Sequence, residues 1–85
     1  MRRKKRTYIR LAAYFAAIPP GTQRVDLTLK DLEQVLGEPL PPHARFPFWW
    51  TNSARTVHAR AWLFSDWEVV EMDRYSQTVK FHRSD

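Results

Sequence analysis

The sequence predicts a small α+β domain whose elements follow the order helix, strand, helix, helix, strand, strand. Apolar residues repeat at helical spacing in some segments, alternate with polar residues in others, and are interrupted by prolines in the middle of the chain. The 85 residues are 44% hydrophobic, which suits one domain with a compact core and excludes a disordered chain.

Two elements open the predicted domain. An amphipathic helix covers about residues 7–18, and Pro19-Pro20-Gly21 ends it. Polar and apolar residues then alternate from 24 to 29, which is typical of a short strand. The apolar positions are Tyr8, Leu11, Phe15 and Ile18 in the helix, and Val25, Leu27 and Leu29 in the strand.

The second helix is predicted from its two ends. Thr28 and Asp31 are spaced as in a capping box, in which each side chain accepts a hydrogen bond from the other's backbone. The helix runs from Leu29 to Leu36. Gly37 is the expected residue after it, because glycine adopts the left-handed conformation without strain.

Prolines prevent residues 38–51 from forming one regular element. The same stretch is rich in aromatic residues, so we expect an ordered loop that these side chains hold in place. A third helix follows and runs to about Phe64. The residues expected to cap its start are Thr51, Asn52 or Ser53.

A hairpin completes the domain. Its first strand is Trp67 to Asp73, its turn ends at Gln77, and its return strand is Thr78 to His82. The expected faces are Trp67 and Val69 on one side of the first strand, Val70 and Met72 on or near the other, and Val79 with Phe81 on one face of the second.

This element order is that of a winged helix-turn-helix. In that fold the strand after the first helix pairs with the terminal hairpin, and the third helix is the candidate DNA-recognition helix. The loop before the third helix is longer than in a standard helix-turn-helix. The predicted fold class is therefore an α+β winged helix with a disordered basic arm at its N-terminus.

Five short segments together resemble a small bacterial and phage domain of unknown function, over about residues 8–83. The resemblance implies a winged-helix fold and supplies no catalytic residues. Relatives tend to have glycine just before the strand tryptophan, where this chain has Asp66; aspartate tolerates the left-handed conformation, so we expect the turn to survive. The segments are Leu-Gly-x-Pro-Leu-Pro at 36–41, Trp49-Trp50-x-Asn52, Ala59-Arg-Ala-Trp-Leu63, Trp67-x-Val69 and Val79-x-Phe81.

The positive charge of the chain is concentrated at one end. Residues 2–6 are five consecutive bases, out of 14 Lys and Arg against 9 Asp and Glu in the whole chain. Without these five, the remainder has 9 of each and is formally neutral. We expect residues 1–6 to be a solvated, flexible arm that binds a polyanion, either nucleic acid or an anionic membrane surface, and residues 7–83 to be the folded domain.

A second charge pattern lies within the folded part. No acid occurs from Pro39 to Ser65, whereas Asp66 to Asp73 contains four acids and no base. A basic surface without carboxylates is what a phosphate backbone requires. The alternative is an ordinary solvated face.

These patterns predict duplex DNA binding by the third helix together with the arm, with RNA less favoured. Arginine pairs with guanine and asparagine with adenine, although Asn52 alternatively fixes a loop. On the third helix we expect Ala54, Val57, His58 and Ala61 to face inward, with His58 hydrogen-bonded in the core. The candidate nucleic-acid-binding residues are Arg2, Arg3, Lys4, Lys5, Arg6, Arg45, Asn52, Ser53, Arg55, Thr56, Arg60, Arg74 and Lys80.

The aromatic cluster of the loop has two interpretations. Its rings either form core or stack on unpaired bases. A mixed arrangement places Trp50 inside and leaves Phe46 or Phe48 exposed as a protein contact. The rings are Phe46, Phe48, Trp49 and Trp50.

Little in the sequence indicates catalysis. The chain has no cysteine and two glycines, and its three histidines lack metal-ligand spacing, so we predict no enzyme activity, cofactor or metal. No apolar run approaches the roughly 20 residues of a membrane span. We expect a cytoplasmic, nucleoid-associated regulator or a DNA-binding subunit of a larger complex, as monomer or dimer. The alternative is a protein-interaction module, such as a phage inhibitor or an adaptor subunit.

Overall fold

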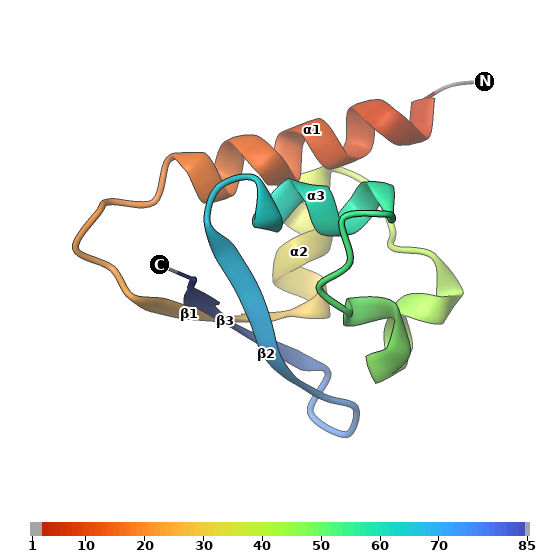
Figure 1. Cartoon of the computed structure of the whole chain (residues 1–85). Coiled ribbons are helices and arrows are strands. Elements are labelled where there is room, and N and C mark those ends of the chain that lie inside the picture. Colours follow the sequence, from red (N-terminus) through yellow and green to blue (C-terminus); the bar gives the residue numbers. More distant parts are fainter. Residues whose placement is uncertain (1–2, 85) are drawn as a thin grey trace.

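The computed structural model describes residues 3–84, with side chains from Tyr8 onward. Within these residues the fold is a mixed α+β arrangement of three helices and a three-stranded antiparallel sheet, as predicted (Figure 1). The elements are α1 (Arg3–Ala16), β1 (Arg24–Thr28), α2 (Leu29–Leu36), the 3-10 helices η1 (Pro42–Arg45) and η2 (Pro47–Trp50), α3 (Val57–Leu63), β2 (Trp67–Asp73) and β3 (Thr78–Arg83).

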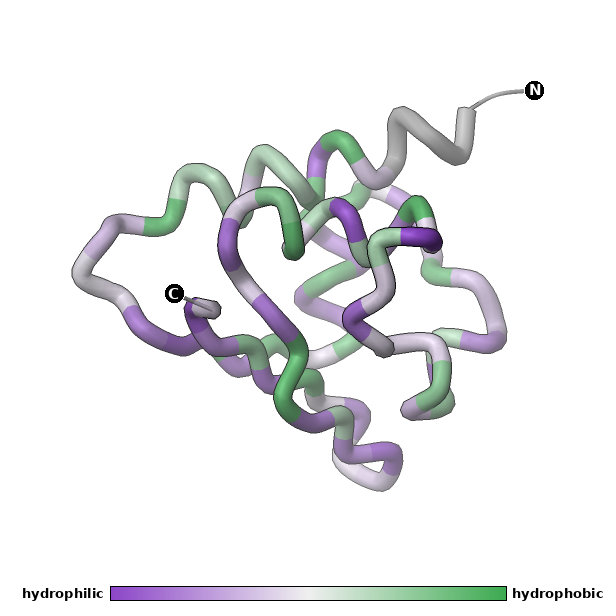
Figure 2. Tube along the Cα trace, in the orientation of Figure 1, coloured by the Kyte–Doolittle hydropathy of each residue, from purple (hydrophilic) through white to green (hydrophobic). Residues whose placement is uncertain are grey.

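The sheet has the strand order β1-β3-β2, with β3 in the centre. Both pairings are antiparallel, so the predicted pairing of the first strand with the terminal hairpin is confirmed. The helices lie together on one side of the sheet (Figure 1). Polar and apolar residues alternate along β2 in Figure 2 except at its middle, where Val69 and Val70 are consecutive.

A bulge at Val70 changes which side chains of β2 face the core. Val69 pairs with Phe81 and Glu71 pairs with Lys80, so Val70 is the extra residue. The extra residue shifts the two-residue alternation by one position. Met72 is therefore buried while Val70 is exposed, and our prediction that these two share a side is wrong.

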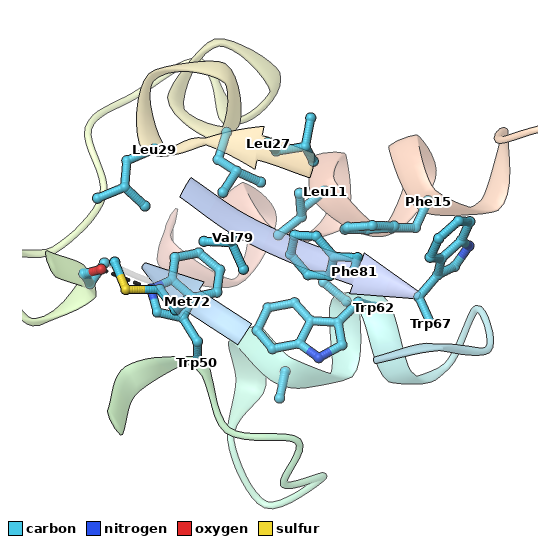
Figure 3. Close-up of a cluster of buried hydrophobic side chains, with 14 of the residues drawn as sticks. Leu11, Phe15, Leu27, Leu29, Trp50, Trp62, Trp67, Met72, Val79 and Phe81 are labelled. Atoms are coloured by element: carbon cyan, nitrogen blue, oxygen red, sulfur yellow. Dashed lines mark hydrogen bonds between the residues drawn. The ribbon is translucent and has the colours of Figure 1, made fainter. Parts of the chain in front are cut away.

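The core is centred on Phe81, whose side chain is fully buried. Its ring lies 4.7 Å from that of Phe15 in α1 and 5.5 Å from that of Trp62 in α3, measured between centroids (Figure 3). Burying each such side chain stabilises the fold by about 1.5–3 kcal/mol. The aromatic residues of three elements thus hold α1 and α3 against the sheet.

Both ends of α2 are as predicted. Thr28 Oγ1 accepts a hydrogen bond from the Asp31 N–H at 3.0 Å, and Asp31 Oδ2 accepts one from the Thr28 N–H at 3.0 Å, which confirms the capping box. Gly37 follows the helix with φ 82°, in the left-handed region. Local sequence therefore fixes where this helix begins and ends.

The first helix starts earlier than predicted. It begins at Arg3, so the backbone of residues 3–6 is helical where we predicted an irregular arm. Arginine and lysine are good helix formers, and neither glycine nor proline separates them from α1. Arg2 lies outside the described residues.

The third helix starts later than predicted. Its N-cap is Thr56, whose Oγ1 accepts a hydrogen bond from the Ala59 N–H at 3.4 Å, so capping by residues 51–53 is wrong. Because the helix begins at Val57, the predicted inner face is also wrong in part: Val57 is exposed and Ala59 is buried. No helix within residues 3–84 is long and apolar enough to cross a membrane.

Candidate nucleic-acid interface

The loop between α2 and α3 is anchored by Trp50. This side chain is buried, and its Nε1–H donates a hydrogen bond to the Ala44 carbonyl at 2.8 Å, drawn as a dashed line in Figure 3. Its ring stacks on Trp62 with centroids 5.6 Å apart. The predicted ordered loop is confirmed, because Trp50 holds η1 and η2 against the core.

Asn52 has a structural role. Its Oδ1 accepts hydrogen bonds from Trp62 Nε1 at 3.0 Å and from the Val69 N–H at 2.8 Å, and its Nδ2 donates to the Val69 carbonyl at 2.8 Å. The amide thus pairs with the outer edge of β2 as a neighbouring strand would. This arrangement confirms the loop-fixing alternative for Asn52, because its amide is engaged by the protein itself.

His58 also holds the loop in place, through Trp49. Its Nε2–H donates to the Trp49 carbonyl at 2.7 Å, and the two rings stack with centroids 3.6 Å apart. Burial lowers the pKa of His58, and the hydrogen bond to Trp49 opposes this shift. The predicted hydrogen-bonded histidine on the inner side of α3 is confirmed, as a half-buried residue.

Tyr8 connects α1 to this anchor. Its ring centroid lies 6.0 Å from that of His58 and 6.4 Å from that of Trp49, and burial raises the pKa of the Tyr8 hydroxyl. The helices α1 and α3 run alongside each other and begin on the same side of the molecule (Figure 1). The basic run, which ends two residues before Tyr8, therefore starts α1 on the side where α3 begins.

Arg55 and Arg60 lie at this end of the molecule. The Arg55 N–H donates to Ser53 Oγ at 3.3 Å, and its guanidinium forms no hydrogen bond or ion pair with the described side chains. Arg60 is exposed, and its Nε donates to the Ala54 carbonyl at 2.7 Å. The two predicted arginines are thus brought together around residue 54.

The two other polar residues predicted here serve the backbone. Thr56 Oγ1 donates to the Ser53 carbonyl at 3.0 Å and caps α3, and Ser53 Oγ accepts from Arg55. These bonds shape the turn that carries the arginines. The side chains of Arg55 and Arg60 therefore face solvent. Those of Asn52, Ser53 and Thr56 fix the loop.

Lys80 lies on a different surface, the outer face of the sheet. Its Nζ is 3.7 Å from Glu71 Oε1, and Asp26 is its partner on the other neighbouring strand. Glu68 and Asp73 occupy further outward positions on β2. This face carries more acids than bases and is unfavourable for phosphate.

Arg45 and Arg74 lie in a third region, around η1 and the β2–β3 turn. The Arg74 guanidinium carbon is 4.8 Å from the centroid of the Phe46 ring. Arg45 is exposed and lines a cavity of about 780 Å³ between η1, the start of α2 and the hairpin turn. The thirteen predicted residues thus do not form one surface.

Asn52 and its two hydrogen-bond partners, Trp62 and Val69, belong to the segments that carried the family resemblance. The chain belongs to DUF7662. This family is described as a domain of unknown function, and its model matches residues 8–85. No match was found among the curated proteins or among the solved structures.

The DUF7662 match begins at Tyr8, so the basic run lies outside it. Within the DUF7662 domain the turn before β2 survives as expected, with Asp66 at φ 65°. One exposed base that sequence reasoning missed is Arg10, whose Nη1 donates to the Leu36 carbonyl at 3.4 Å. In the sequence, the only indication of Arg10 is its position one helical turn after Arg6. Residues 3–84 contain no cluster of three side chains suited to a metal ion.

Proposed function

We propose that this DUF7662 domain binds nucleic acid, with duplex DNA favoured, through the surface where α1 and α3 begin. The observation that carries the proposal is the pair Arg55 and Arg60, held around Ala54 in a segment without acids. The start of α1, which includes residues 3–6 of the basic run, lies on the same side. Phosphates bind clustered cations. One carboxylate, that of Glu38, lies near the start of α1, where burial raises the pKa of the Tyr8 hydroxyl and this carboxylate adds to the shift.

The topology supports a winged-helix version of this proposal. The element order and the sheet order β1-β3-β2 are those of a winged helix, in which the third helix approaches the DNA. Here α3 has seven residues, and its outer side carries Val57 and Arg60, with Phe64 exposed directly after the helix. We infer that Arg60 contacts phosphate while the apolar side chains meet the groove wall or a protein.

The hairpin does not act as a DNA-contacting wing in this proposal. Lys80 is paired with Glu71, and the outer face of the sheet is acidic, so close approach of phosphate there is unfavourable. DNA is bound at the other end of the domain. The protein then acts as a regulator or as the DNA-binding subunit of a larger complex.

The test is the salt dependence of duplex binding, measured by fluorescence anisotropy from about 50 to 300 mM salt. The double variant Arg55→Ala/Arg60→Ala should bind more weakly and lose about two units of the log–log salt slope, one per phosphate contact. The matched control is Arg24→Ala/Lys80→Ala, which removes the same charge from the outer sheet face. Equal losses in the two variants, or no salt-dependent binding at all, would refute the proposal.

A second candidate function is a protein-interaction module. The observation that favours it is the exposure of apolar side chains at the two ends of α3, where Val57 is 43% exposed and Phe64, directly after the helix, is 74% exposed. A second copy of the chain is the partner that can be tested directly. Sedimentation should show concentration-dependent association of the wild type and its loss in Phe64→Asp; a wild type that stays monomeric rules out this partner.

A further inference from the structure

A second surface suited to nucleic acid lies on η2 and the residue before it. The rings of Phe46 and Phe48 are parallel, with an interplanar angle of 7° and centroids 5.9 Å apart. Phe48 is 63% exposed, unlike the buried Trp50 two residues later. We call Phe46 and Phe48 the aromatic platform.

The geometry of η2 explains why Phe48 faces solvent. A 3-10 helix has three residues per turn, so consecutive side chains point in three different directions. Trp50 points into the core, and Trp49 packs against His58 and Tyr8. The Phe48 side chain takes the third direction, toward solvent. The mixed arrangement expected for the aromatic cluster is therefore the one observed, with Trp50 inside and Phe48 exposed.

Two arginines and a histidine lie near the platform. The Arg74 guanidinium carbon lies 4.8 Å from the Phe46 centroid, and the His43 ring lies 6.1 Å from that of Phe48. Arg45, next to Phe46 in the sequence, is exposed and forms no side-chain hydrogen bond or ion pair within the described residues. The exposed Phe48 ring, with Arg74 over the neighbouring Phe46 and Arg45 next to it in the sequence, is suited to a planar ligand that carries negative charge.

The acid closest to Arg74 in the sequence is committed to the hairpin turn. Asp73 Oδ1 accepts hydrogen bonds from the N–H groups of Tyr75 at 2.9 Å and Ser76 at 3.4 Å. This carboxylate therefore shapes the turn that carries Arg74 and forms no ion pair with it. No acid occurs between Glu38 and Asp66 in the sequence. Glu33 lines the same cavity as Arg45, and its Oε2 accepts a hydrogen bond from the Leu40 N–H at 2.8 Å.

We propose that the aromatic platform stacks an unpaired base of single-stranded nucleic acid, while Arg45 and Arg74 bind the flanking phosphates. Every base has a π-face, so such stacking tolerates any sequence, whereas a duplex keeps its bases inside. This inference rests on the proposed function, because it adds a single-strand site to a nucleic-acid-binding domain. It assigns the platform a ligand different from the duplex bound at α1 and α3.

The test compares two labelled single strands of about 12 nucleotides, a length within single-strand site sizes. One is oligothymidine and the other is an abasic strand, which has the same phosphates but no bases. The wild type should bind oligothymidine at least about fivefold more tightly, since stacking of one base is worth that much. Phe48→Ala should remove this preference. The control, Val70→Ala, removes an exposed apolar side chain from β2 and should keep it.

The outcomes separate the two proposals. Equal binding of the two strands by the wild type, with salt-dependent duplex binding intact, overturns the platform alone. A preference that survives in Phe48→Ala also overturns it and leaves Phe48 as a protein contact. Absence of salt-dependent binding to the duplex and to both strands overturns the proposed function, and the platform with it.

Discussion

Neighbouring residues of the loop before α3 divide into two groups. The polar side-chain atoms of Trp50 and Asn52 are hydrogen-bonded within the domain, to Ala44, Trp62 and Val69. Phe48 and Arg55, which lie on either side of them in the sequence, are exposed to solvent. The difference indicates two roles: Trp50 and Asn52 hold the loop, and the exposed side chains on either side of them are available to a ligand. Stability and binding should then respond to different substitutions.

The largest effect on stability should come from the central anchor. Trp50→Ala should lower the free energy of unfolding by about 3–5 kcal/mol, because it leaves a cavity against Trp62 and an unpaired Ala44 carbonyl. Urea denaturation followed by circular dichroism measures this loss. Phe48→Ala, at an exposed ring of the same loop, should change stability by no more than about 0.5 kcal/mol. Similar losses in both variants would remove the distinction.

A smaller loss is expected at Asn52. Replacement by alanine leaves Trp62 Nε1 and the Val69 N–H without their acceptor, which should cost about 1–3 kcal/mol. Arg55→Ala, three residues away, should be neutral in the same urea titration and should weaken DNA binding instead. If Asn52→Ala were as stable as Arg55→Ala, the side-chain amide would not be an anchor.

The smallest effect concerns pH and His58. Its folded-state pKa lies below the ordinary value of 6.5, so between the two values the unfolded chain binds more protons. The free energy of unfolding should therefore be highest above pH 6.5 and fall as the pH drops toward the folded-state pKa. His58→Gln keeps a donor for the Trp49 carbonyl and cannot titrate, so its stability should vary less over this range. Parallel profiles for the two proteins would contradict the assignment.

Elements with local signals could be predicted from the sequence, and those decided by distant residues could not. The capping box at Thr28 and Asp31 fixes α2 within four residues, so the sequence specified its bounds. The start of α3 was missed because several residues from 51 to 56 can cap a helix. Asn52 is engaged by Val69, 17 positions away, which leaves Thr56 as the cap. The bulge at Val70 is likewise a property of strand pairing.

The candidate site shows the same limit. Charge alone identified Arg55 and Arg60, because an acid-free segment is visible in the sequence. The charge pattern did not separate these two arginines from Lys80. The pairing of Lys80 with Glu71 follows from the register of the sheet. Nor did it show that the aromatic platform and the arginines lie on separate parts of the loop.

The most direct test of the central claim is an NMR titration of the full chain, labelled with ¹⁵N, with a short DNA duplex. The account predicts shifts at Arg55, Arg60 and the first turns of α1, including the side-chain Nε–H of Arg55. The outer face of the sheet, around Lys80 and Glu71, should be unaffected. Shifts centred on that face, with the Arg55 region unchanged, would contradict the account.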